Sequence, residues 1–269
     1  MIRQPAVAGY FYPADPEELG REVDAFLAAQ KSTEKLQALG CVVPHAGYRY
    51  SGGVAGAVFA RLELPSRYII LCPRHYPQGA PLAVHPDGEW ITPLGTVPVD
   101  GELAAALKRE CPSLREDSVA HSEEHALEVQ LPFLQRRIGK FCFVPIAVGP
   151  VRFDALAELG RAMARAIGTL KEPVLIVASS DMNHYESDAV TRVKDRKAIE
   201  RILALDARGL YDTVQREDIS MCGVGPATAM LTAASELGAK RAVEIQYATS
   251  GDADGRRQRV VGYAGIVVQ

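Results

Sequence analysis

Long apolar stretches are missing from this sequence of 269 residues. Its apolar runs, such as RYIILCP and PVLIVASS, are too short to span a bilayer. The first residues, MIRQPAVAGYFYPADP, hold no apolar core of the kind that a signal peptide needs. We therefore expect neither a membrane span nor a signal peptide.

A strong excess of either charge is also missing. The 30 Lys and Arg residues are nearly balanced by 33 Asp and Glu residues, which gives a net charge of -3. The sequence has no basic stripe with interleaved aromatic residues, which argues against a nucleic-acid partner. It has no polybasic amphipathic helix either, so we expect no binding to a membrane surface.

Paired cysteines are a third absence. The chain holds five cysteines, an odd number, and no CxxC pair. This usage favours a reduced protein in the cytoplasm over a disulfide-linked secreted one. Cys41, Cys72 and Cys142 lie within apolar runs, where cysteine commonly packs as a small hydrophobe.

No internal repeat, low-complexity tract or linker divides the chain, so we expect one domain over residues 1–269. Continuous apolar runs alternate instead with amphipathic segments. This alternation predicts an α/β fold with a central mixed, mostly parallel sheet and helices on both faces. The last two strands, joined by a short turn, predict an antiparallel edge. Strands are expected at 39–45, 67–75, 140–149, 173–181, 242–250 and 258–269, and helices near 15–30 and at 52–62, 100–110, 123–138, 152–167, 190–205 and 225–238.

Three of the six histidines follow predicted strands, namely His45, His75 and His184. In a sheet of this kind, function gathers at the carboxyl ends of the strands. Any one of these histidines could simply cap a turn or pack at the sheet edge. Three on one rim favour a metal site, because neutral imidazole is a common ligand for zinc, iron and copper.

A further ligand is expected from Cys222, which lies at a loop-to-helix junction in SMCGVGPATAM. A helix N-terminus lowers the pKa of a thiol and favours the thiolate, which binds zinc, iron or copper(I) strongly. An inert thiol buried under the following helix is the alternative. The predicted metal ligands are therefore His45, His75 and Cys222.

Two histidines four residues apart mark the stretch HSEEHALEVQLPF. The stretch fails the HExxH pattern of zinc peptidases, because Ser122 stands where the glutamate would be. The acidic pair before His125 is typical of the start of a helix. We expect His125 and Glu128 to line the pocket or to support the ligands from behind, and His121 to lie on the surface.

The stretch SSDMNHY places Ser180, Asp181 and His184 close together, as a serine hydrolase would require. No GxSxG motif is present, however, and the partners of a catalytic triad usually come from separate segments. A more plausible role for Asp181 is to orient a histidine.

Taken in order, a set of motifs resembles the Memo family, whose prokaryotic members are often called AmmeMemoRadiSam system protein B. The set runs from about Pro5 to the end of the chain and so covers nearly all of it. Its members are AVAGYFYP, PHAGYRYSG, CPRHY, EEHALEVQLPFLQ, SSDMNHY, MCGVGPA and TSGDADG…VVGYAG.

The Memo family is similar in fold to the LigB-type class III extradiol dioxygenases. The resemblance implies a LigB-like α/β domain and places His45, His75 and Cys222 at the metal-ligand positions. It places His184 at the histidine that ring-cleaving relatives use as acid or base, with Asp181 as its acidic neighbour. Those relatives hold Fe(II) with two histidines and a carboxylate, so the cysteine is a departure.

These inferences favour a mononuclear non-haem metal enzyme of oxygenase or redox type. We expect Fe(II), with copper or zinc as alternatives, and a small aromatic or enolisable substrate. His184 would move the proton, Asp181 would hold it in place, and Tyr48 and Tyr185 would line the pocket.

Two other hypotheses stay open. The first is a peptide- or protein-binding module with a vestigial metal site. The resemblance names a radical SAM protein and an AMMECR-like protein as its possible partners. The second is a zinc-dependent hydrolase or lyase, which would act without oxygen.

Overall fold

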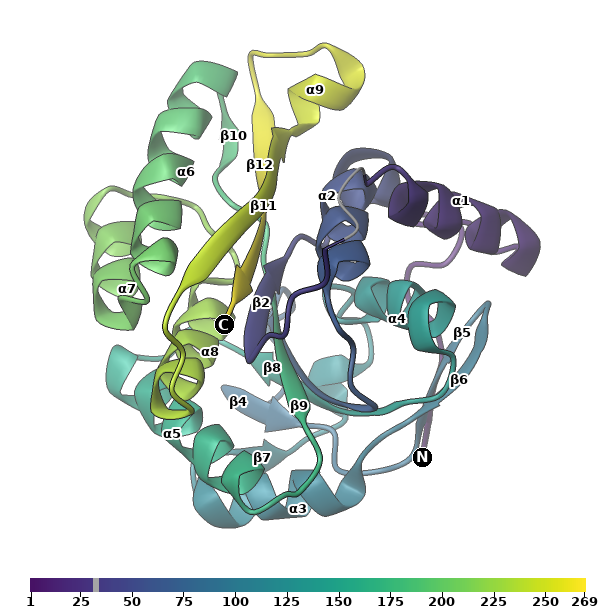
Figure 1. Ribbon diagram of the computed structural model, residues 1–269, viewed down its shortest axis with the longest axis vertical. Helices are drawn as coiled ribbons and strands as arrows, with labels where there is room; N and C mark the ends of the chain where they lie inside the picture. The colour runs from purple at the N-terminus through teal and green to yellow at the C-terminus, as the bar shows by residue number, and fades with distance from the viewer. Residues whose placement is uncertain (31–33) are drawn as a thin grey trace.

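The computed structural model describes residues 1–30 and 34–269, and a large mixed sheet organises it (Figure 1). The strands are β1 (Ile2–Arg3), β2 (Gly40–Val43), β3 (Arg67–Pro73), β4 (Leu82–Val84), β5 (Glu89–Thr92), β6 (Gly95–Pro98), β7 (Arg115–Glu116), β8 (Cys142–Val148), β9 (Val174–Ser179), β10 (His184–Glu186), β11 (Ala242–Thr249) and β12 (Val260–Val268). The order in the large sheet is β10-β12-β2-β9-β3-β8-β4-β7, with β11 paired to β12.

The centre of the sheet is parallel, as the continuous apolar runs predicted. Strands β2, β9, β3 and β8 pair with their neighbours in parallel, for example Cys41 with Val177. At both ends the pairing becomes antiparallel, through β12 on one side and β4 on the other. The predicted antiparallel edge is confirmed by the pairing of β11 with β12.

Helices cover both faces of the sheet. They are α1 (Pro16–Ala28), α2 (Tyr48–Arg61), α3 (Gly101–Glu110), α4 (Leu131–Ile138), α5 (Phe153–Gly168), α6 (Asp188–Leu203), α7 (Ala207–Arg216), α8 (Val224–Glu236) and α9 (Ser250–Asp254), with short 3-10 turns η1 (Val119–His121) and η2 (Glu128–Gln130). Helix α1 begins as predicted, since the Asp15 side chain accepts hydrogen bonds from two N–H groups of the first turn and Pro16 follows it.

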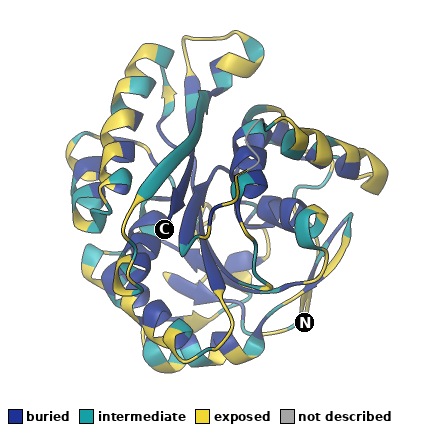
Figure 2. Ribbon diagram, viewed as in Figure 1, coloured by how far each residue is buried: buried dark blue, intermediate teal, exposed yellow. Residues whose placement is uncertain are grey.

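Alternating side chains of the central strands feed two separate apolar cores. On β3, Ile69 and Leu71 pack with α3, α5, α6, α7 and α8, whereas Ile70 and Cys72 pack with α1, α2 and α4. Figure 2 shows the central strands buried and the outer helix faces exposed. The mixed α/β architecture predicted from the sequence is therefore confirmed.

Three predicted elements differ from the structure. The helix expected at 123–138 begins only at Leu131, because residues 123–127 form an irregular segment that the 3-10 turn η2 follows. The helix expected at 52–62 begins earlier, at Tyr48, with Gly47 as its N-cap. The short turn expected between the last two strands contains the helix α9, which ends at Gly255 in a left-handed conformation.

A small second sheet of order β1-β5-β6 fixes the N-terminal segment beside α4 (Figure 1). Strand β1 pairs in parallel with β5, which carries the buried Trp90. The Arg3 guanidinium lies 4.2 Å from the centroid of the Trp90 ring.

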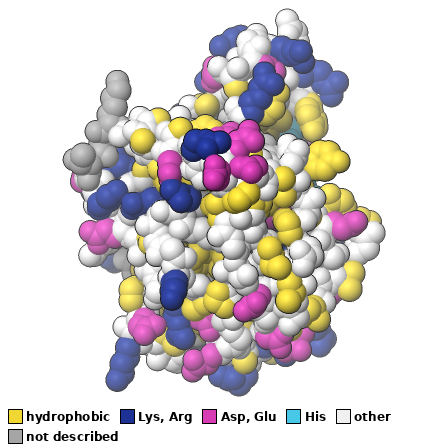
Figure 3. Space-filling model, turned by 90° about the vertical axis from the view of Figure 1, so that its right-hand side faces the viewer, with side chains coloured by type: hydrophobic (Ala, Val, Ile, Leu, Met, Phe, Trp, Pro, Cys, Tyr) yellow, Lys and Arg dark blue, Asp and Glu magenta, His cyan; other side chains and the backbone are white. Residues whose placement is uncertain are grey.

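In the part of the chain that the structure describes, no helix is long and apolar enough to cross a membrane. On the face in Figure 3, basic side chains gather on the projecting top of the molecule, and histidine shows only as a small patch beneath it.

Candidate metal centre

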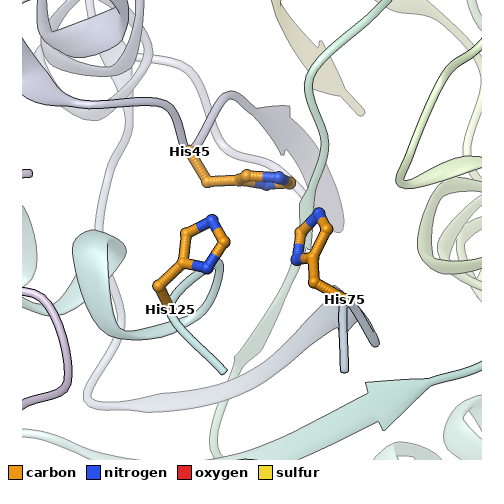
Figure 4. Close-up of side chains that lie close together, drawn as sticks. All are labelled: His45, His75 and His125. Atoms are coloured by element: carbon orange, nitrogen blue, oxygen red, sulfur yellow. The ribbon is translucent and has the colours of Figure 1, made fainter. Parts of the chain in front are cut away.

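Three histidine side chains meet at the carboxyl edge of the sheet (Figure 4). His45 follows β2 and His75 follows β3, and these strands lie on either side of β9. His125 comes from the irregular segment before η2. One ligand atom from each residue lies within 4.8 Å of the others, so the group could hold a metal ion. The sequence had pointed to the first two histidines and had given His125 a supporting place.

The three rings face one another from different directions. The centroids of His45 and His75 are 5.2 Å apart, and those of His45 and His125 are 5.7 Å apart, with each pair at a steep angle. His75 and His125 are nearly parallel, at 22° and 4.7 Å. Three imidazoles fixed by separate segments provide a rigid nitrogen donor set of the kind that zinc, iron and copper prefer.

Hydrogen bonds fix the tautomer of His45. The Ser179 hydroxyl donates to the Ala126 carbonyl at 2.5 Å, so its oxygen is an acceptor for His45 Nδ1 at 2.9 Å. Gln130 Nε2 also donates to Ser179 Oγ at 2.9 Å and holds the hydroxyl in place. Nδ1 of His45 therefore carries the proton, and Nε2 is left with its lone pair free for a metal ion.

Glu124 fixes the tautomer of His75 in the same way. Its buried carboxylate accepts the His75 backbone N–H at 2.7 Å and the Nδ1–H of the ring at 2.9 Å. It also accepts the backbone N–H of Ala126 at 2.9 Å. His75 Nε2 is thus the free nitrogen, and a carboxylate behind a histidine is a common support of a metal ligand. The sequence gave no separate signal for Glu124, because an acidic pair before His125 is typical of a helix start.

Burial sets the charge of the cluster. It lowers the pKa of His45 well below its usual range, and the neighbouring His75 lowers it further. It also lowers the pKa of His125 to about 4. For His75, burial lowers the pKa, but the hydrogen bond and charge of Glu124 outweigh it and the pKa is raised. At neutral pH His45 and His125 are therefore neutral imidazoles, the form that binds metals.

Cys222 lies beside the histidines, at the junction before α8. Its Sγ is 3.3 Å from His45 Nε2, and it accepts the backbone N–H of Asp181 at 3.3 Å. Burial raises the pKa of the thiol well above its usual range, and the Asp181 carboxylate adds to the rise. The expected lowering by the helix N-terminus is therefore wrong for the metal-free protein, although a bound cation would favour the thiolate.

His184 also faces this pocket, but its support differs from the prediction. Its Nδ1 lies 2.9 Å from the Ser220 carbonyl, which can only accept, so Nδ1 carries the proton and Nε2 is free. The Ser220 hydroxyl accepts the His184 backbone N–H at 2.7 Å. Asp181, expected to hold this ring, instead accepts the backbone N–H of His45 at 2.8 Å. Burial raises the pKa of the Asp181 carboxyl, and that hydrogen bond offsets only part of the rise.

A pocket of about 590 Å³ collects these groups. Phe11 packs edge-on to His125 at 4.7 Å between ring centroids, and Tyr185 is 64% exposed, so the two aromatic residues stand at different depths of the pocket wall. Tyr185 has a backbone φ of 63°, which is unusual for a residue with a side chain. The lining residues are Phe11, His45, Ala46, Gly47, His75, His125, Asp181, His184, Tyr185, Ser220, Cys222 and Val261.

Neither Tyr48 nor Glu128 lines the pocket, and Glu128 takes the second of the two places expected for it, behind the ligands. Tyr48 is buried in the core, where its hydroxyl donates to the Val129 carbonyl at 2.6 Å. Glu128 is buried below the pocket, where its carboxylate binds Arg3 and accepts the Tyr12 hydroxyl at 2.5 Å. The surface position predicted for His121 is wrong, since the residue has no exposed area.

The Arg3–Glu128 ion pair supports the metal centre from behind. Arg3 Nη2 also donates to the Glu124 carbonyl at 2.7 Å, and Arg3 Nε donates to the His121 carbonyl at 2.9 Å. The irregular segment that carries Glu124 and His125 is thus held by the N-terminal strand. A lone arginine at position 3 gave no signal in the sequence, because its partners lie more than 115 residues away.

Comparisons with known proteins agree with one another. The sequence model described as Memo-like protein matches residues 3–267. A MEMO1 family protein from Pyrobaculum arsenaticum is 44% identical, with 99% of this chain and 98% of the relative covered. A MEMO1 family protein from Methanopyrus kandleri is 43% identical, with 99% of each chain covered, and one from Methanosarcina acetivorans is 42% identical, with 100% and 99% covered.

Proposed function

The chain belongs to the Memo family, and we propose that it is a mononuclear non-haem metal enzyme of oxygenase or redox type. Its substrate would be a small aromatic or enolisable molecule that enters the pocket beside His184. The observation that carries this proposal is the group of three histidines whose ligand atoms lie within 4.8 Å of one another at the carboxyl edge of the sheet.

The donor set fits a first-row transition metal. His45 and His75 each have one nitrogen held by a hydrogen bond and the other left free, which is the arrangement of metal-bound histidines. His125 supplies a third imidazole, which is neutral at pH 7. When bound, iron or copper would supply electron exchange with dioxygen and substrate.

Cys222 is placed to be a further donor. A nitrogen and a sulfur on one tetrahedral ion, at about 2.1 Å and 2.3 Å from it, lie about 3.6 Å apart. The distance of 3.3 Å between His45 Nε2 and Cys222 Sγ is close to that value. We therefore propose His45 and His75 as common ligands, with His125 and Cys222 completing the set.

His184 is the group proposed to move a proton. Because its Nδ1–H is held by the Ser220 carbonyl, Nε2 is available to accept a proton from a substrate hydroxyl or an enolisable C–H. Asp181 would act on the other side by fixing the backbone of His45. Phe11 and Tyr185 offer apolar ring surface to an aromatic substrate.

The three-histidine group also favours a second function. Three imidazoles with an open fourth position are the ligands of hydrolytic and hydrating zinc enzymes. A zinc-dependent hydrolase or lyase would use the same residues without oxygen. The two functions differ in the metal that is retained and in the need for dioxygen.

Metal analysis of protein purified without oxygen and without added metal tests both functions. We would compare the wild type with His45→Ala, His125→Ala and Cys222→Ala. Stoichiometric iron or copper that His45→Ala loses supports the redox function, and zinc supports the hydrolytic one. Loss of the metal from His125→Ala or from Cys222→Ala identifies the third ligand. Equal metal in all four proteins would refute the proposed site.

The partners implied by the family resemblance stay a prediction. A pull-down with the radical SAM and AMMECR-like proteins of the same organism would test them. Retention of binding by His45→Ala would separate such a partnership from the metal chemistry.

A further inference from the structure

A second pocket lies on the other side of Cys222. It has a volume of about 590 Å³ and is lined by the ends of β3 and β8 and the starts of α5 and α8. Cys222 lines both this pocket and the metal pocket, so this residue stands in the wall between them. The position matches the rule that open α/β sheets bind ligands outside the carboxyl ends of their strands. The volume is typical of a small-molecule site.

The lining of this pocket is positively charged. Among the described residues that form it are Arg74 and Arg152, and no acidic residue. Arg74 donates through Nη1 to the carbonyls of Gly79 and Ala80, which leaves the guanidinium fixed at the pocket wall. Its Nε is buried and has no partner among the described residues. The guanidinium keeps its positive charge at this wall, where it attracts an incoming anion.

Two long helices begin at the same place. Helix α5 has 16 residues and α8 has 13, and neither N-cap residue, Arg152 or Gly223, makes a side-chain capping hydrogen bond. At the start of α8, the Ser180 hydroxyl accepts the Gly223 N–H at 3.1 Å. Gly225 lets α8 approach β8, because a β-carbon there would lie 2.9 Å from Val148 Cγ1. The free N–H groups of a helix N-terminus attract anions. Arginines and helix starts therefore act in the same direction in this pocket.

We propose that this second pocket binds an oxyanion, a phosphate or carboxylate group of a small ligand, against Arg74, Arg152 and the starts of α5 and α8. The rest of the ligand extends along Tyr211 and Gln215 toward Cys222. The ligand thus reaches the thiol from the side opposite the histidines. None of the three histidines lines this pocket, and Cys222 is the one proposed metal ligand that the two pockets share.

The test measures thermal unfolding of the metal-free full chain in inorganic phosphate, in succinate and in chloride at equal ionic strength. We expect phosphate or succinate, but not chloride, to raise Tm, and the ion that acts identifies the group. Arg152→Gln should weaken this binding about tenfold or more, because a charge-assisted hydrogen bond is lost. The matched control is Arg161→Gln, which removes an exposed arginine from the same helix and should leave the response unchanged.

Two more variants localise the ion. Gln215→Trp keeps the charge but fills the pocket from the exposed face of α7, so it should also reduce the response. His45→Ala should retain it, even if the proposed metal function fails. No response to either oxyanion would overturn the proposal. So would an equal loss in Arg161→Gln, or a loss in His45→Ala, which would place the ion in the metal pocket.

Discussion

Replacing Glu124 with glutamine tests how the protein prepares His75 for a metal ion. The carboxylate accepts three hydrogen bonds, two from His75 and one from Ala126, and it has no exposed side-chain area. Glutamine has the same shape but keeps only one acceptor oxygen. Its NH₂ group must face one of these donors or turn the His75 ring nitrogen into an acceptor.

The second outcome changes the tautomer of His75. With Nδ1 accepting from glutamine, the proton moves to Nε2, the nitrogen that faces the metal centre. A protonated nitrogen cannot bind a metal, so the tautomer must be reversed on binding. Loss of such a support typically weakens metal affinity by about 10–100-fold, or about 1.4–2.8 kcal/mol. We expect a loss in this range for Glu124→Gln.

The assay is a chelator competition with Zn²⁺, which is redox-inert and therefore usable in air. The matched control is Glu123→Gln, because Glu123 is the exposed neighbour and its change removes the same charge. We expect the control to bind Zn²⁺ as the wild type does. Circular dichroism of the metal-free proteins checks that both variants fold. Wild-type affinity in a folded Glu124→Gln protein would refute the argument that Glu124 sets the His75 tautomer.

Three further predictions concern stability. Arg3→Met leaves the buried Glu128 carboxylate without its cation and should lower the free energy of unfolding by about 3–5 kcal/mol in urea. Burial raises the pKa of Asp195 from 3.8 to about 7, so the folded state holds its proton more tightly and stability is lost as pH rises through this window. Asp195→Asn should remove roughly 1–4 kcal/mol of that loss. Gly223→Ala would place a β-carbon 2.5 Å from a β9 carbonyl oxygen and should cost about 1–3 kcal/mol and displace Cys222.

Each of these has a contrary outcome. Arg21→Ala breaks an exposed pair with Glu17 and should change stability by no more than about 0.5 kcal/mol. If Arg3→Met changed stability no more than Arg21→Ala does, the burial of the Arg3–Glu128 pair would not matter. Glu200 lies exposed on the same helix as Asp195, so Glu200→Gln is the control. If it changed the pH dependence of stability as Asp195→Asn does, Asp195 would not be the cause of the loss. Unchanged stability of Gly223→Ala would show that α8 has room to move.

The elements that sequence predicted well are those with a strong local signal. The strands around Cys41, Ile69 and Ile176 are continuous apolar runs, and a run that is buried on both faces needs no partner to be recognised. Helix α1 carried its own start in Asp15 and Pro16. The irregular segment before η2 was missed, because Glu123 and Glu124 resemble a helix start, whereas the Glu124 carboxylate accepts hydrogen bonds from His75 instead.

By itself, the sequence determined the parallel centre of the sheet and the placement of His45 and His75 at strand ends, because hydrophobic periodicity and chain order fix both. Only the tertiary structure decided what stands beside them. It brought His125 into the group and put Glu124 behind His75. It also bonded the His184 ring to the Ser220 carbonyl and buried Glu128 under the N-terminal strand. Such pairings depend on side chains up to 125 residues apart, and local propensity carries no information about contacts made after the chain has folded.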